Sequence, residues 1–204
     1  MIARIIGWSA LVSLRVLARV HSNSAARQRS PGQCIYIANH SSHLDVLLLL
    51  SVLPPALWDR TRPVAAAEYW TAGPIRRWLI HSIFKGVLLG REKGGLNPLE
   101  PVAAALRYGD SLIFFPEGTR GPGGNLLPLK PGIFHIAKWF PGVDIIPVWI
   151  GNSRRLLPKM FAIPVPLKCS IQFGAALRWR TGQKQEEFLA EARQALESLQ
   201  SNLV

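Results

Sequence analysis

Residues 34–45 decide how this chain folds, and their sequence is CIYIANHSSHLD. The first five residues are uncharged and apolar, a pattern typical of a strand that is buried on both faces. A polar turn follows, and from His43 an apolar helical pattern continues to Leu53, where two prolines end it. A buried strand that turns directly into a helix is the basic unit of an α/β domain.

Along the rest of the chain, short apolar runs alternate with helical patterns. The predicted strands cover residues 34–38, 63–67, 86–90, 111–115, 145–150 and 168–173. The predicted helices cover residues 43–53, 74–84, 96–108, 131–140 and 184–203. This alternation predicts an α/β fold, a single domain with a central, mostly parallel sheet flanked by helices. Two polar or Pro-rich stretches, residues 21–33 and 151–167, are predicted to be a linker and a surface excursion.

The N-terminal residues predict an amphipathic helix. On a helical wheel, Arg4, Arg15 and Arg19 fall within about 60° of one another, and apolar side chains cover most of the remaining surface. Such a helix can lie in a membrane interface, with its apolar side chains among the acyl chains. The alternative is a helix packed on the domain's own core. We therefore divide the chain into a membrane-associating helix, residues 1–22, and one domain, residues 23–204.

Two other interpretations of the N-terminus are disfavoured. A signal peptide needs a continuous apolar region, which Arg15 and Arg19 interrupt. No stretch of 18 uncharged apolar residues exists, so the sequence predicts no transmembrane helix.

The charge of the chain indicates an anionic partner, since 24 Lys and Arg stand against 12 Asp and Glu in 204 residues, for a net charge of +12. Nucleic acid and an anionic membrane surface both suit such a protein. Seven Trp favour the membrane, because Trp prefers the interface between water and lipid. The basic residues form no known nucleic-acid motif, so we expect no nucleic-acid partner. Cys34 and Cys169 have neither metal-binding nor disulfide spacing, which indicates a reducing cytoplasm.

His40 and Asp45 are the first candidate catalytic residues. On a regular helix they would point about 140° apart, so they can meet only if the chain turns at the serines between them. The Asp would then fix the tautomer of a His at the carboxyl end of a strand, where ligands of α/β sheets bind. Because the chain lacks a G-x-S-x-G nucleophile elbow, we expect His40 to activate a substrate hydroxyl as general base. The alternative is that both residues cap an ordinary helix, and His43 is expected to turn away from His40.

Residues 114–120, FFPEGTR, form a second candidate site after a predicted strand. Backbone amides of the turn, the Thr119 hydroxyl and the Arg120 guanidinium could all donate to one phosphate. Glu117 would either hold the loop or accept a hydrogen bond from a substrate hydroxyl. The alternative is an ordinary β-turn with solvated charges.

Two further segments are weaker indications of a functional site when each is considered alone. Arg91 follows the predicted strand 86–90. An Arg at such a position is more often an ordinary surface residue than a phosphate ligand. Pro147 interrupts the strand 145–150, and because Pro is rare in a central strand it predicts a sheet edge or a bulge.

Together, the segments N-H-x-S-x-x-D at 39–45, GVLLGR at 86–91, FPEGTR at 115–120 and IPV at 146–148 resemble the four sequence blocks of the glycerolipid acyltransferases. The closest resemblance is to the 1-acylglycerol-3-phosphate (lysophosphatidate) acyltransferases, and it covers about residues 35–175. It implies that His40 and Asp45 are catalytic. It also implies a phosphate site, made by Arg91, Glu117, Gly118, Thr119 and Arg120.

Two positions depart from the family pattern. Gly90 stands where an acidic residue usually precedes the Arg, and a single Lys130 stands where two adjacent Lys often occur. Lys130 is therefore carried over as a candidate contact for the substrate or the donor.

The resemblance implies a function in phospholipid biosynthesis. An acyl group would move from a thioester, on coenzyme A or acyl carrier protein, to the free hydroxyl of 1-acyl-sn-glycerol-3-phosphate, a lysophospholipid, to form phosphatidate. Neither a metal nor a resident cofactor is expected. We expect the enzyme at the cytoplasmic face of the bacterial inner membrane, bound to anionic lipid. The alternatives are another acceptor, such as glycerol-3-phosphate or a lyso-aminolipid, and a non-catalytic basic module that binds lipid or nucleic acid.

Overall fold

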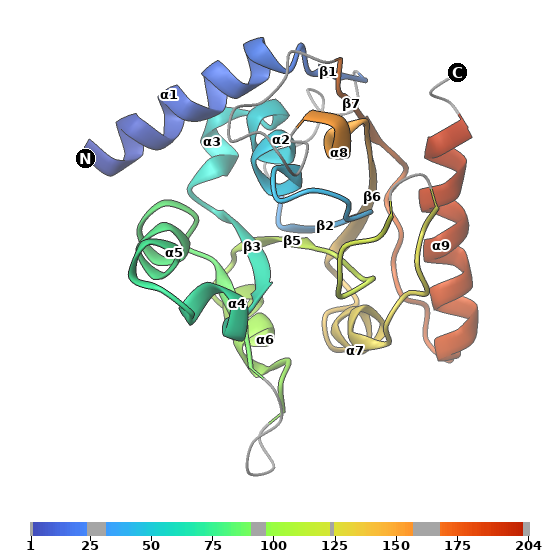
Figure 1. Cartoon of the computed structure of the whole chain (residues 1–204). Coiled ribbons are helices and arrows are strands. Elements are labelled where there is room, and N and C mark those ends of the chain that lie inside the picture. The colour runs from blue at the N-terminus through green and yellow to red at the C-terminus, as the bar shows by residue number, and fades with distance from the viewer. Residues whose placement is uncertain (1, 24–31, 91–96, 123–124, 157–167, 202–204) are drawn as a thin grey trace.

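One sheet organises the protein in the computed structural model, which describes residues 2–23, 32–90, 97–122, 125–156 and 168–201. Within these residues the sheet has the strand order β1-β7-β6-β2-β5-β3-β4 (Figure 1). The strands are β1 (His21–Ser22), β2 (Cys34–Ala38), β3 (Thr61–Ala66), β4 (Val87–Leu89), β5 (Ser111–Phe114), β6 (Asp144–Gly151) and β7 (Ser170–Phe173). All neighbouring strands are parallel except β6 and β7, so the predicted α/β domain with a mostly parallel sheet is confirmed.

The helices alternate with the strands along the chain and lie beside the sheet in space (Figure 1). The larger ones are α1 (Ile2–Leu17), α2 (Asp45–Val52), α6 (Glu100–Arg107), α7 (Gly132–Trp139) and α9 (Gln185–Ser201). The short ones are α3 (Pro55–Trp58), α4 (Ala67–Thr71), α5 (Pro74–Trp78), the π-helical turn η2 (Leu79–Ile83) and α8 (Ser153–Leu156).

Strand β2 shows why an uninterrupted apolar run was needed at residues 34–38. Its side chains alternate between two buried layers, as the pleat of a strand requires. Tyr36 packs in one layer with residues of α1 and α2, whereas Ile35 and Ile37 pack in the other with residues of α6, α7 and α9. Because helices cover both faces, every residue of β2 is buried.

The predicted helix at residues 74–84 is two elements in the structure. The α-helical part ends at Trp78, and five residues of π-helix follow. This wider turn places Ile80 fully inside the protein, directly against Gly86 at the start of β4. A side chain at Gly86 would collide with Ile80, so the glycine is what permits this approach.

Pro147 marks a bulge, the second of the two features predicted for it, although β6 lies inside the sheet. Val148 pairs with Phe173, and Ile145 pairs with Leu177. Three steps along β6 thus face four steps on the neighbouring segment, so that segment holds one extra residue. The break occurs where Pro147 has no N–H to donate, while its carbonyl accepts from Gly174 at 2.8 Å.

The predicted linker, residues 21–33, is partly wrong. His21 and Ser22 form strand β1 and pair with β7, so the chain joins the sheet before the predicted domain begins at residue 23. Of the predicted surface excursion, residue 151 belongs to β6 and residues 153–156 form α8. The remainder of that excursion, 157–167, lies outside the described residues.

Helix α1 presents apolar side chains on two sides. Leu11 and Leu14 are buried in the layer that contains α2, which matches the alternative of a helix packed on the core. Val12 and Val16 are 55% and 70% exposed, so apolar surface also faces outward. The Arg15 guanidinium donates to the carbonyl of Ser51 at 3.4 Å and is therefore directed toward the domain, not to a separate charged face. In the part of the chain that the structure describes, no helix is long and apolar enough to span a membrane.

Candidate active site

His40 and Asp45 meet just beyond the carboxyl end of β2. Nδ1 of His40 lies 2.9 Å from Oδ2 of Asp45, whose side chain is completely buried. The same oxygen accepts hydrogen bonds from the backbone N–H groups of Ser41 and Ser42 at 2.7 and 2.8 Å. The chain thus turns at the two serines, and α2 begins at Asp45 itself.

This geometry assigns the tautomer of His40. An ionised carboxylate only accepts hydrogen bonds, so Nδ1 of the neutral imidazole carries the hydrogen and Nε2 keeps its lone pair. The imidazole is 21% exposed and stacks on the ring of Phe115, with the ring centroids 4.1 Å apart. The ring is held on one edge and one face, and Nε2 is the nitrogen available for a substrate proton.

Asn39 and Ser153 support this turn, and sequence reasoning assigned neither of them a role. The Asn39 amide donates to the carbonyl of Ile150 at 3.0 Å and accepts from its N–H at 2.7 Å, so it joins the ends of β2 and β6. Ser153, which is buried, shares a hydrogen bond of 2.8 Å with the hydroxyl of Ser41. Asn39 was visible in the sequence as the first residue of the 39–45 segment, whereas Ser153, two positions after β6, carried no such signal.

Glu117 ties the two main motifs together. Its carboxylate is buried, with Oε1 accepting from the backbone N–H of His40 at 2.7 Å and Oε2 accepting from the N–H of Leu127 at 2.8 Å. In return, the carbonyl of His40 accepts from the N–H of Gly121 at 2.8 Å. Of the two roles considered from the sequence, the geometry therefore favours holding the loop.

Gly118, Thr119 and Arg120 are exposed on the same loop. Gly118 has φ +66°, and a side chain there would meet the aliphatic end and ammonium of Lys130 at 2.8 Å. The backbone N–H of Lys130 also donates to the carbonyl of Pro116 at 2.8 Å. The structure thus brings Lys130 to the predicted phosphate loop, whereas Arg91 lies outside the described residues.

Arg120 contacts His43 of the first motif. Because a guanidinium only donates, Nε2 of His43 must accept from Nη1 of Arg120, and the imidazole is neutral. The His43 ring stacks on Tyr69 at 5.4 Å, and the Arg76 guanidinium lies 4.4 Å from the centre of the Tyr69 ring. Burial lowers the pKa of His43, and the charges of Arg120, His40 and Arg76 lower it further, against a raising effect of Asp45.

Comparison with known proteins identifies this arrangement. The family model named Acyltransferase matches residues 18–151, which include both motifs. The chain belongs to the acyltransferase family. The predicted family resemblance is thereby confirmed.

Curated relatives of this acyltransferase carry more specific names. The mouse 1-acyl-sn-glycerol-3-phosphate acyltransferase alpha is 37% identical over 61% of this chain and 42% of its own length. The 1-acyl-sn-glycerol-3-phosphate acyltransferase of Salmonella typhimurium is 30% identical over 67% of this chain and 54% of its own. The match therefore spans about half the length of these relatives.

A crystal structure extends the comparison to the fold. The 1-acyl-sn-glycerophosphate (LPA) acyltransferase PlsC from Thermotoga maritima aligns with 96% of this chain and 79% of its own, with a TM-score of 0.73 and 22% identity. The acyltransferase fold thus includes the region of β7 and α9, which lies beyond the matched family model.

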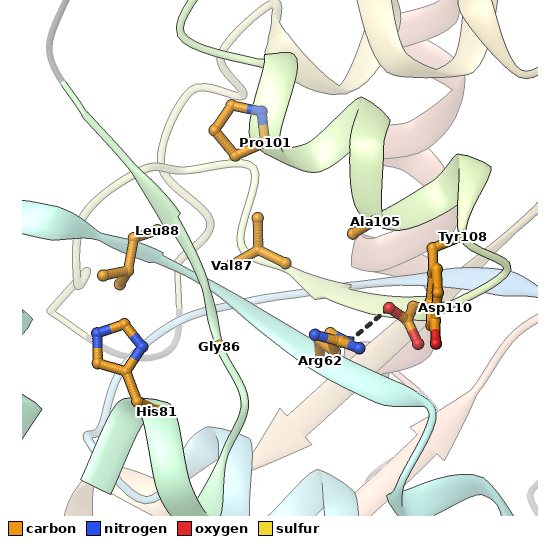
Figure 2. Close-up of a pocket in the computed structure, with 9 residues that line it drawn as sticks. All are labelled: Arg62, His81, Gly86, Val87, Leu88, Pro101, Ala105, Tyr108 and Asp110. Carbon is orange, nitrogen blue, oxygen red and sulfur yellow. Dashed lines mark ion pairs between the residues drawn. The ribbon is translucent and has the colours of Figure 1, made fainter. Parts of the chain in front are cut away.

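The acyltransferase also has a cavity of about 460 Å³ away from this site (Figure 2). It lies beside β4 and α6, and its polar end is formed by Arg62 and Asp110, which are joined by an ion pair of 2.5 Å. Asp110 precedes β5 and Arg62 is near the start of β3, so this polar end is at the amino ends of these strands. His40 follows the carboxyl end of the parallel strand β2, so the polar end of the cavity and the candidate active site lie at opposite ends of the strands.

The arrangement can supply a general base and hydrogen-bond donors for an anion. Neutral Nε2 of His40 can accept a proton, and the buried Asp45 carboxylate can stabilise the imidazolium that results. Thr119, Arg120 and Lys130 are donors that can hold a phosphate. Among the described residues, no three His, Cys, Asp or Glu side chains are grouped to bind a metal.

Proposed function

We propose that this protein transfers a fatty acyl group from an acyl thioester to the free hydroxyl of 1-acyl-sn-glycerol-3-phosphate and so forms phosphatidate. The single observation that carries the proposal is the tie between Glu117 and the backbone of His40. It holds an anion-binding loop beside a His–Asp pair, as a phosphate-bearing acceptor with a nearby hydroxyl requires. The names of the relatives in mouse and Salmonella support this acceptor.

The proposed chemistry needs one base. The hydroxyl oxygen of the acceptor attacks the thioester carbonyl carbon, while Nε2 of His40 takes the hydroxyl proton. The tetrahedral oxyanion then collapses, the C–S bond breaks, and the leaving thiolate takes up a proton from the imidazolium or from water. Asp45 keeps the imidazole in the required tautomer and offsets its positive charge during the step.

Direct attack by the acceptor hydroxyl fits the environment of Cys169. Cys169 is buried, and burial raises the pKa of its thiol to about 12. A thiol with this pKa supplies very little thiolate near neutral pH. No covalent acyl-enzyme on this residue is therefore part of the proposal.

Arg120 and Thr119 are proposed to hold the phosphate of the acceptor. Gly118 is proposed to shape their loop, since its N–H already donates to the carbonyl of Phe115 at 3.0 Å. Arg91 and Lys130 are proposed to assist, Lys130 because it already lies against Gly118. Both donors considered, acyl-coenzyme A and acyl carrier protein, are anionic and suit a chain with a net charge of +12. We place the enzyme at the cytoplasmic face of the bacterial inner membrane, with α1 on the bilayer surface.

The experiment is an acyl-transfer assay with purified protein, labelled acyl-coenzyme A or acyl-acyl carrier protein, and a panel of acceptors. We expect labelled phosphatidate from 1-acyl-sn-glycerol-3-phosphate, and no product from the same acceptor without its phosphate. A preference for glycerol-3-phosphate or a lyso-aminolipid would replace the proposed acceptor. Absence of transfer to any acceptor would refute the enzyme assignment.

A further inference from the structure

The short helix α5 carries large apolar side chains that the domain leaves uncovered. Ile75 and Trp78 are 73% and 50% exposed, and a spacing of three places them on the same side of the helix. Tyr69 of the neighbouring α4 is 38% exposed. Exposed side chains of this size in one place indicate an interaction surface rather than ordinary surface residues.

Positive charge lies within the same helix. Arg76 and Arg77 stand between Ile75 and Trp78, and both guanidinium groups are held close to the chain. Arg76 lies over the ring of Tyr69, and Arg77 donates to the carbonyl of Thr71 at 3.2 Å. A Trp ring can enter the headgroup region of a bilayer, and guanidinium groups next to it can bind anionic headgroups. This combination is suited to contact with an anionic bilayer.

The position of α5 matches that of α1. Figure 1 shows both helices on the same side of the molecule, away from α9, and α1 contacts the turn η2 that continues α5. Both helices carry exposed apolar side chains, Val12 and Val16 on α1 and Ile75 and Trp78 on α5. Tyr69 stacks on His43, so this surface also reaches the first motif of the active site.

We propose that Ile75 and Trp78, with Arg76 and Arg77, form a second contact with an anionic bilayer beside α1. This inference rests on the proposed function, because a lysophospholipid acceptor resides in a bilayer. Contact at α5 brings the lipid surface to the side of the site where His43 and Arg120 lie. The acceptor then reaches the phosphate loop without leaving the interface.

The chain offers a closely matched pair of variants for the test. Helix α5 ends in Arg77-Trp78. Helix α7, which packs in the layer opposite to α1 and α2, ends in Lys138-Trp139, with Trp139 44% exposed. The double variant Arg77→Gln with Trp78→Ser removes the proposed contact. The control, Lys138→Gln with Trp139→Ser, removes one positive charge and one exposed Trp from α7 instead. Binding is measured by co-sedimentation with phosphatidylcholine vesicles, with and without phosphatidylglycerol.

We expect the α5 double variant to bind vesicles with phosphatidylglycerol at least about fivefold more weakly, since one Arg near such a surface contributes about 1 kcal/mol. The α7 variant should bind like the unchanged protein. Equal binding of both double variants would overturn the inference, and Ile75→Ser provides a second test if the α5 variant fails to fold. A change of oligomeric state in the α5 variant without a change in vesicle binding would make this face a protein interface and also overturn it.

A second measurement separates this inference from the proposed function. On a monomeric, short-chain acceptor the α5 variant should keep its full activity, whereas on vesicle-borne acceptor its rate should fall with binding. If the unchanged protein transfers no acyl group to either acceptor but still loses vesicle binding in the α5 variant, the bilayer contact stands and the enzyme proposal fails. Loss of activity on both acceptors with unchanged binding would contradict the bilayer contact.

Discussion

The Glu117 carboxylate accepts a hydrogen bond from the backbone N–H of His40 across 77 positions of sequence. Its other oxygen accepts from Leu127, so no lone acidic charge faces the phosphate loop. Glu117 therefore links the proposed acceptor loop to the backbone of His40, the proposed base.

We expect Glu117→Ala to leave two partly buried N–H groups without their partners, a cost of at most about 1–3 kcal/mol each. The melting temperature should fall and kcat should decrease. Glu117→Gln should recover only part of both, because its NH2 group would face the N–H of Leu127. Asp110→Asn is the control, a buried acid at the opposite end of the strands. It should lower the melting temperature, and the folded fraction should keep its kcat; an equal loss of kcat in both variants would contradict the positioning role.

His40→Ala should remove nearly all acyl transfer, a loss of about 10²–10⁴ in kcat for a general base. Asp45→Asn should also be severe, because Asn can present its NH2 group to Nδ1 and favour the wrong tautomer. Initial rates at matched folded concentration test this, with His135→Ala on α7 as control. Substantial activity in His40→Ala, or an acyl group trapped on a Ser or Cys, would refute the direct-attack mechanism.

Arg120→Lys should raise the acceptor KM and leave the donor KM nearly unchanged, since an ammonium cannot reproduce a bidentate guanidinium contact. His43→Ala should shift the acceptor KM in the same direction, because His43 holds Arg120 by accepting its hydrogen bond. His43→Gln retains a side-chain acceptor and should be milder than His43→Ala. An unchanged acceptor KM in His43→Ala would show that this contact does not position Arg120.

The environment of His43 also predicts a pH dependence of stability. Its pKa is lowered in the folded protein, mainly by burial and Arg120, so below the ordinary value of about 6.5 the unfolded chain binds more protons than the native one. Above that pH both states hold a neutral ring, so His43 gives the free energy of unfolding no pH dependence. Below it the unfolded chain gains the proton first, so the free energy of unfolding decreases as pH falls. The melting temperature of the unchanged protein should therefore fall relative to that of His43→Gln as pH falls from about 7 to about 5. A constant difference over this range would contradict the prediction.

Two sides of α1 should respond differently to substitution. Val12→Ser with Val16→Ser alters exposed positions, so vesicle binding should weaken while the melting temperature stays nearly constant. Leu14→Ser alters a buried position and should lower the melting temperature. Because α1 also packs on the core, these variants test the bilayer contact more cleanly than deletion of residues 1–20. Unchanged sedimentation of the Val12 and Val16 variant with anionic vesicles would place the anchor elsewhere.

Local sequence was sufficient for the elements and for the pairing of His40 with Asp45. Strands such as β2 and β5 are recognisable because a strand buried on both faces needs an unbroken apolar run. The turn at Ser41 and Ser42 is encoded in adjacent residues, so the meeting of His40 and Asp45 could be put forward from local sequence, beside the alternative that both cap a helix. The same applies to α9, where Phe188, Ala192 and Leu196 are buried as their helical spacing predicts.

Sequence by itself thus determined the strands other than β1, the larger helices and the local His–Asp turn. Only the tertiary structure decided that Glu117 reaches His40, that His43 meets Arg120, and that Trp78 is left exposed. The reason is the strand order, in which β2 and β5 are neighbours although α2 to α6 lie between them in the chain. Spacing within one segment follows from the period of a helix or strand. Contacts between segments follow from how strands pair and which helix faces are covered, and no local pattern specifies either.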